Sequence, residues 1–169
     1  FAPAHGIEMS VVTRQNLLEF GHPSPYELHF SPSNQASYAA GEMDFVGEML
    51  DPDLAAHFTI TRARGICLYG ESVGRVFPPI PRAAYLDSIR SDAAWSYANV
   101  QRGPDDGKGR VPVYAVLNYC RAFAYIAEDL VTSKREGGAW GLRCLPAEYA
   151  PIIQAALDKY SHRGSAEEV

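Results

Sequence analysis

The feature that most constrains the fold is a change in the spacing of apolar residues near residue 51. Before it, residues 7–13 and 26–30 alternate apolar and polar side chains, which is typical of β-strands with one polar face. After it, apolar residues recur at helical spacing, which predicts helices over about 51–64, 82–100, 112–129, 132–143 and 146–161. Two strands are too few for an independent sheet. We therefore expect an α+β fold, with a few strands followed by an all-α helical bundle.

The connections between these elements are rich in turn-forming residues. We expect a rigid turn at 21–25, a polar loop at 31–41, a proline-stiffened connector at 76–81 and a loop at 102–110. Thr132 or Ser133 is the expected N-cap of the fourth helix, with Glu136 in its first turn.

The expected core of the bundle comes from two apolar stripes. The third helix presents Val113, Val116, Leu117, Cys120, Phe123, Ala124 and Ala127, and the last presents Ile152, Ile153, Ala156 and Leu157. Trp140 and Tyr160 lie on apolar stripes too, and Cys144 lies in an apolar helical stretch, so core packing is expected for all three.

Charge and composition exclude several functional classes. The chain has 169 residues, 47% of them apolar, and 15 basic against 20 acidic residues give a formal net charge of −5. This acidic balance argues against duplex binding and is compatible with a small cationic ligand. No apolar run approaches the roughly 18 residues of a membrane span. We expect a cytoplasmic, monomeric protein with three reduced cysteines, and the first residue, Phe1, indicates a processed or partial polypeptide.

Few residues stand out as chemically functional, because no phosphate loop, dinucleotide motif, nucleophile elbow or zinc-protease motif occurs. Glu8 lies among apolar strand residues and is either solvated, a general base or a third carboxylate beside a metal-bound phosphate. Lys134 lies at a helix start, where a cation is locally unfavourable, so it is either exposed or paired with an anion such as a phosphate. Glu27 on the second strand has the same interpretations as Glu8.

The order of several short segments resembles one family of enzymes. These segments are residues 6–12, 26–30, 62–70 and 76–81, then Ser133-Lys134 with Trp140 six residues later, then residues 145–149 and Tyr160. Together they resemble the aminoglycoside adenylyltransferases that modify streptomycin and spectinomycin. The resemblance extends from about residue 5 to about residue 162.

This resemblance implies two domains and a reaction. Residues 1–45 would be the last strands of a nucleotidyltransferase domain, and residues 46–169 a helical C-terminal domain. The reaction would be O-adenylylation of an aminoglycoside-like, cationic small molecule, with ATP and magnesium. Glu8 matches the catalytic base, Lys134 a phosphate-binding lysine and Tyr160 a tyrosine near the nucleotide.

The resemblance also marks the positions of substrate contacts. The family's tryptophan after the second strand corresponds to a position near Ser33. Its acidic residue and histidine correspond to positions near Val111 and Tyr114. Asp105 and Asp106, in the loop before the third helix, are candidates to replace that acidic residue.

One family motif does not occur in this sequence. The metal-binding Asp-x-Asp pair that follows a Gly-Ser motif is missing, so we expect no metal ligand in this chain and no catalysis by this piece alone. The alternative is a non-catalytic small-molecule-binding or interaction module that retains the fold.

Overall fold

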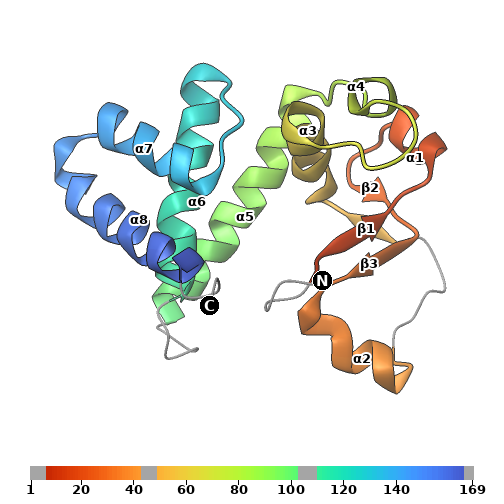
Figure 1. The fold of residues 1–169 in the computed structure, drawn as a ribbon, viewed down its shortest axis with the longest axis horizontal. Helices are drawn as coiled ribbons and strands as arrows, with labels where there is room; N and C mark the ends of the chain where they lie inside the picture. Colours follow the sequence, from red (N-terminus) through yellow and green to blue (C-terminus); the bar gives the residue numbers. More distant parts are fainter. Residues whose placement is uncertain (1–6, 43–48, 103–109, 166–169) are drawn as a thin grey trace. The chain divides into compact units, whose positions relative to one another are not determined.

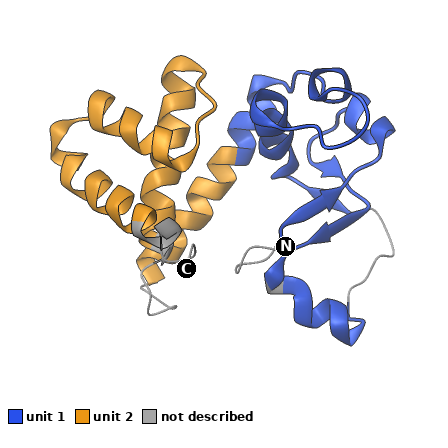
Figure 2. Ribbon diagram, viewed as in Figure 1, with its two compact units in different colours: residues 1–88 blue, residues 89–169 orange. Residues whose placement is uncertain are grey.

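The computed structural model describes residues 7–42, 49–102 and 110–165 (Figure 1). The chain divides into two compact units, residues 1–88 and residues 89–169 (Figure 2). The domain boundary at 45/46 that the family resemblance implies stays a prediction, and the compact units divide at a later position.

The first unit contains two small antiparallel pairs of strands. β1 (Met9–Val11) pairs with β3 (Leu28–Phe30), with Met9 opposite Phe30 and Val11 opposite Leu28. β2 (Ser24–Pro25) pairs with β4 (Leu50–Asp51). The two predicted strands are present but shorter than their alternating segments, and Glu8 lies directly before β1 rather than in the middle of a strand.

The short helices of the first unit were predicted unevenly. α3 (Leu54–Arg64), which ends at Gly65, follows the sequence pattern, and α1 (Arg14–Leu18) lies between β1 and β2. The prediction of a polar loop at 31–41 was wrong, because η1 (Pro32–Asn34) and α2 (Gln35–Ala40) occupy it. Pro32 suits a first helical position, and Gly41 ends α2 with a positive φ of 68°. α4 (Val73–Val76) precedes the extended connector.

Aromatic and aliphatic side chains from α1 and α3 form the core of the first unit. Leu17, Leu54 and Phe58 are buried together. The Phe58 ring lies 6.5 Å from that of Phe20 and 5.9 Å from that of Phe77. These contacts attach α1, α3 and the segment after α4 to one another, and so fix the wall of the cavity described below.

The second unit is helical throughout its described part. α5 (Arg82–Arg102) begins in the first unit and ends in the second, and α6 (Arg110–Glu128), α7 (Lys134–Cys144), η2 (Ala147–Tyr149) and α8 (Ala150–Ser165) follow (Figure 1). α6, α7 and α8 pack against one another. The α+β class and the helical bundle are therefore confirmed. None of the helices within the described ranges has the length and apolar character needed to cross a membrane.

The core of the bundle confirms most of the predicted stripe of α6. Val113, Leu117 and Ala156 are buried together, and Cys120, Ala124, Ile153 and Trp140 are also buried. Close approach depends on glycines, since a Cβ at Gly138 would lie 2.6 Å from a methyl group of Leu157 and one at Gly141 would lie 2.7 Å from the Cys120 sulfur.

Several residues expected in this core are exposed instead. The exceptions are Phe123, Ala127, Cys144, Ile152 and Tyr160. Phe123 and Ile152 are about half exposed because they line an open apolar groove of about 570 Å³ on the second unit. Apolar spacing identifies the helix face correctly but does not reveal where a neighbouring helix stops covering it.

Candidate functional site

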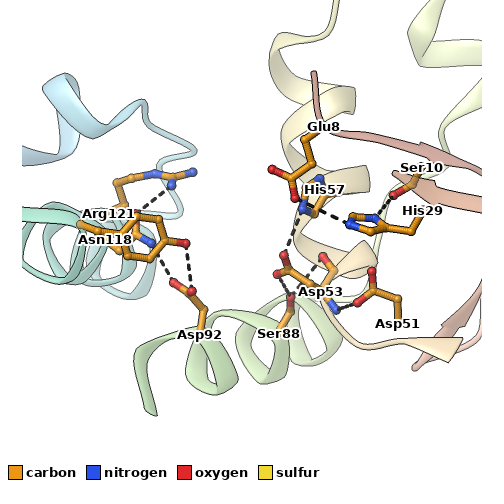
Figure 3. Close-up of polar contacts among 11 residues, drawn as sticks. Glu8, Ser10, His29, Asp51, Asp53, His57, Ser88, Asp92, Asn118 and Arg121 are labelled. Carbon is orange, nitrogen blue, oxygen red and sulfur yellow. Dashed lines mark hydrogen bonds and ion pairs between the residues drawn. The ribbon is translucent and has the colours of Figure 1, made fainter. Parts of the chain in front are cut away.

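Glu8, the expected catalytic base, lies at the start of β1 with its side chain 63% exposed. Its Oε1 lies 4.0 Å from His29 Nε2, and the other ring nitrogen of His29 lies 3.0 Å from Ser10 Oγ (Figure 3). β1 pairs with β3 so that Ser10 lies opposite His29, and this strand register places the His29 imidazole beside Glu8. The carboxylate is thus open to solvent and has a titratable neighbour.

A cavity of about 600 Å³ lies beside Glu8 within the first unit. Its polar lining includes Glu8, Arg14, His57 and Glu71, and its apolar lining includes Leu17, Leu54, Phe58, Val76 and Phe77. Arg14 and Glu71 form an ion pair on its wall, and that pair lowers the pKa of Glu71 through the hydrogen bond and the charge of Arg14. The volume falls within the range of small-molecule sites.

His57 is a further titratable group of the cavity, and the sequence analysis did not identify it as a candidate. It lies one helical turn after Asp53, and its Nε2 lies 3.0 Å from Asp53 Oδ2. Ser88, which is 1% exposed, donates to the other carboxylate oxygen of Asp53 at 3.1 Å (Figure 3). The hydrogen bond to Asp53 raises the pKa of His57 above 6.5, and the charges of Asp53, Glu8 and Asp51 act in the same direction against its desolvation.

Lys134 is held within the second unit by an aromatic ring. It is the first residue of α7, and its Nζ lies 4.7 Å from the centre of the Tyr114 ring, within the range of cation–π contacts. The side chain is therefore half-buried. The structure thus brings together two residues that the sequence analysis assigned to different roles, Lys134 to the nucleotide and Tyr114 to the substrate.

The start of α7 is fixed by the predicted cap. Ser133 Oγ accepts from the Glu136 N–H at 3.3 Å, and Glu136 accepts from the Ser133 N–H at 2.7 Å, which completes a capping box. The glutamate also offsets the lysine charge near the positive end of the helix dipole. This local pattern explains how the helix tolerates Lys134 at its first position.

The remaining candidate residues are scattered over the chain. Tyr160 lies on α8 and is 39% exposed, so its expected core packing was wrong. Ser33 lies in η1. Asp105 and Asp106 fall outside the described residues. Their roles stay predictions.

The described residues do not form a site for a resident metal ion. Within the described ranges, no group of three or more histidine, cysteine and carboxylate side chains is arranged to hold one. Asp51 and Asp53 are two positions apart, but an Asp51 oxygen accepts from the Asp53 N–H at 2.7 Å, and the Asp53 carboxylate is bonded to His57 and Ser88.

Sequence reasoning missed the polar partners of the candidate residues. Asp53 and His57 have the i,i+4 spacing of a helical pair, and this signal could have identified them. His29, in contrast, meets Ser10 and Glu8 from a strand far away in sequence, and no local pattern marks such contacts.

Comparison with known proteins gives a consistent picture. Residues 75–169 match the family model of the aminoglycoside adenylyltransferase C-terminal domain. An aminoglycoside (3'') (9) adenylyltransferase from Rhizobium radiobacter is 23% identical over 154 residues, 91% of this chain and 54% of the relative. A spectinomycin 9-adenylyltransferase from Staphylococcus aureus is 22% identical over 162 residues, 96% of this chain and 58% of the relative.

A solved structure supports the fold. The chain resembles a crystal structure of spectinomycin adenyltransferase from Enterococcus faecialis, determined with ATP and spectinomycin, with a TM-score of 0.73 at 18% identity. The match covers 92% of this chain and 59% of that protein. This chain thus spans little more than half the length of the relatives that it matches.

Proposed function

The chain belongs to the aminoglycoside adenylyltransferase family, and from this premise we propose that it carries part of the active site of an O-adenylyltransferase. The observation that supports the proposal most directly is the position of Glu8, an exposed carboxylate at the rim of a cavity within the first unit. The proposed reaction joins ATP and a hydroxylated small molecule into an adenylylated product and pyrophosphate.

Glu8 is the proposed general base. As the substrate hydroxyl attacks the α-phosphorus of ATP, its proton passes to a Glu8 carboxylate oxygen, while the bond to pyrophosphate breaks. An exposed carboxylate is accessible to such a hydroxyl. The hydrogen bond between Ser10 and His29 restricts the orientation of the imidazole that faces the carboxylate.

Lys134 and Tyr160 are the proposed nucleotide contacts. A lysine ammonium stabilises the charge that develops on phosphate oxygens as the α-phosphorus is attacked. Tyr160, on α8 and partly exposed, offers a ring and a hydroxyl to the nucleotide. Tyr114, Ser33, Asp105 and Asp106 remain proposed substrate contacts.

Magnesium belongs to this proposal through the family resemblance alone. The described residues do not fit a metal ion, so no step of the mechanism is assigned to one here.

The proposed substrate is an aminoglycoside-like, cationic molecule with free hydroxyl groups. The names of the relatives support the antibiotic class. The formal net charge of −5 favours attraction of a cation over an anion.

Substitution of Glu8 in the complete protein tests the proposal. Glu8→Gln keeps the shape and removes the base, so we expect turnover to fall by about 10²- to 10⁴-fold with ATP affinity retained. Glu27→Gln is the matched control, because Glu27 is also exposed and its backbone N–H, which the substitution keeps, donates to the Val11 carbonyl at 2.8 Å. Turnover of Glu8→Gln within about tenfold of the parent would rule out the base role.

The same experiment addresses the alternative of a non-catalytic binding module. An adenylylated product formed by the parent protein excludes that alternative. Binding of an aminoglycoside by the parent without any AMP transfer supports it.

A further inference from the structure

Asp92 connects α5 to two residues of α6 within the second unit. Its Oδ1 accepts from the Tyr114 hydroxyl at 3.1 Å, and its Oδ2 accepts from Asn118 Nδ2 at 2.8 Å (Figure 3). Tyr114 and Asn118 are one helical turn apart, so one carboxylate binds one face of α6 through two donors. Asn118 is 9% exposed, and such a buried amide is costly to leave without its partner.

The network continues to the start of α7. Arg121 donates to Asn118 Oδ1 at 3.2 Å and to the Thr132 carbonyl at 2.8 Å. Thr132 directly precedes Ser133, the N-cap of α7. The backbone that carries Lys134 is thus fastened to α6 by the same chain of hydrogen bonds that Asp92 begins.

The Lys134 side chain meets this network as well. Its ammonium lies 4.7 Å from the centre of the Tyr114 ring, and the hydroxyl of this tyrosine donates a hydrogen bond to Asp92. The Trp95 ring contacts the same tyrosine edge-on, with centroids 6.2 Å apart. A hydrogen bond from the phenol hydroxyl to a carboxylate increases the electron density of the ring, and this strengthens the attraction of the ring for a cation.

We propose that Asp92 is a positioning residue for Lys134, which acts by holding the Tyr114 ring on which the ammonium rests. A lysine has a long side chain that loses much rotamer freedom on binding a ligand, so a lysine held in advance binds a phosphate more tightly. This inference rests on the proposed role of Lys134 in ATP binding, but its geometric part can be tested without ATP.

The geometric test uses NMR on this chain, which contains only the lysines Lys108, Lys134 and Lys159. The Tyr114 ring current should shift the ε-methylene protons of Lys134 upfield of those of Lys159. The Lys134→Ala spectrum assigns the signal. Asp92→Ala should move it toward the Lys159 position, and Asp92→Asn, which retains one acceptor oxygen, should give an intermediate shift.

Two further variants keep this test decisive. Glu148→Ala, at an exposed carboxylate of the same unit, should leave the Lys134 signal unchanged. Tyr114→Phe keeps the ring but removes the bond to Asp92, and should reduce the upfield shift even if Asp92→Ala does not fold. A Lys134 signal that is the same in the parent, Asp92→Ala and Tyr114→Phe overturns the proposal.

The functional test is a double-mutant cycle in the complete protein. We expect Asp92→Ala to raise the KM for ATP by about 3- to 10-fold with kcat within about threefold, and to have no further effect in a Lys134→Ala background. Equal effects of Asp92→Ala in both backgrounds overturn the positioning role. An unchanged KM in Lys134→Ala alone refutes the proposed nucleotide contact instead, and the NMR result then decides the geometry independently.

Discussion

The helical bundle of the second unit and the first strand of the first unit differ in how far they bury their apolar side chains. In the second unit, Leu117 is fully buried and Gly138 allows Leu157 to approach closely. In the first unit, Met9 and Val11 on β1 are 46% and 42% exposed. An apolar residue stabilises only through the area that it removes from water. The same residue types should therefore differ greatly in energetic importance between the helical bundle and the first strand.

The largest effect that we expect comes from the buried leucine of the bundle. Leu117→Ala should reduce the free energy of unfolding by about 2–5 kcal/mol, because it removes buried methyl groups and leaves a cavity. Met9→Ala should change it by less than about 0.5 kcal/mol, because Met9 is about half exposed. Chemical denaturation followed by circular dichroism measures both. A Met9→Ala effect as large as that of Leu117→Ala would mean that β1 is buried in solution.

A pair of glycines sharpens the same contrast. A Cβ at Gly137 would lie 2.6 Å from Arg121 Cγ and 3.1 Å from the Arg121 backbone nitrogen, so Gly137→Ala should destabilise by about 1–3 kcal/mol. Gly74, on α4, has no atom within 4 Å of its Cβ position, so Gly74→Ala should stabilise by about 0.4–1 kcal/mol. Thermal unfolding of the two variants should give shifts of opposite sign. Shifts of the same sign would contradict the close packing of α6 and α7.

The sequence predicted the elements of the bundle well because their signals are local. Apolar period and capping residues act within one or two turns, as the capping box of Ser133 and Glu136 demonstrates. The exposure of Phe123 was not predictable, because it depends on where other helices leave an open groove. The loop predicted at 31–41 was wrong for another reason, since the prediction depended on the polar composition of the segment, although Pro32 and Gly41 also suit a helix start and a helix end.

The candidate site residues show the same difference between local signals and contacts of distant positions. Glu8 and Lys134 were identified by their residue type and their similarity to a family. Their neighbours were not, since Ser10 and His29 meet through strand pairing, and Tyr114 meets Lys134 between two helices. Such contacts between distant positions depend on register and packing, which a single sequence does not encode locally.

The N-caps of α7 and α1 allow a further comparison of the two units, with a smaller expected change in the free energy of unfolding. Ser133 and Glu136 form a reciprocal capping box on the 11-residue α7, whereas Thr13 accepts one bond, from the Asn16 N–H at 3.1 Å, on the five-residue α1. Ser133→Ala should reduce the free energy of unfolding by about 1 kcal/mol, and Thr13→Ala by about half as much. Urea denaturation of both variants measures the difference. A larger loss in Thr13→Ala would show that α1 contributes more to the stability of its unit than its length indicates.

The smallest effect that we expect is a pH dependence of the free energy of unfolding, and it should differ between the two units. The hydrogen bond that His57 donates to Asp53 raises the pKa of His57 above its ordinary value of 6.5. A raised folded-state pKa stabilises fully below the unfolded value, and this contribution is lost as the pH rises through the folded value. The stability of the parent relative to His57→Gln should therefore be greatest below pH 6.5 and should fall toward alkaline pH.

The bundle provides the contrast for this measurement. Burial raises the pKa of the Cys120 thiol above 9.0, so this thiol stays protonated around pH 6.5, where the contribution of His57 begins to change. Both tryptophans, Trp95 and Trp140, belong to the second unit, so their fluorescence reports on its unfolding, whereas circular dichroism reports on both units. His57→Gln should alter the pH dependence seen by circular dichroism more than that seen by fluorescence. Asp53→Asn should remove most of the difference between the parent and His57→Gln, because the hydrogen bond to the Asp53 carboxylate is the largest cause of the raised pKa. If that difference persists without Asp53, the stabilisation comes from another group, and the contact between Asp53 and His57 does not control the pH response of the first unit.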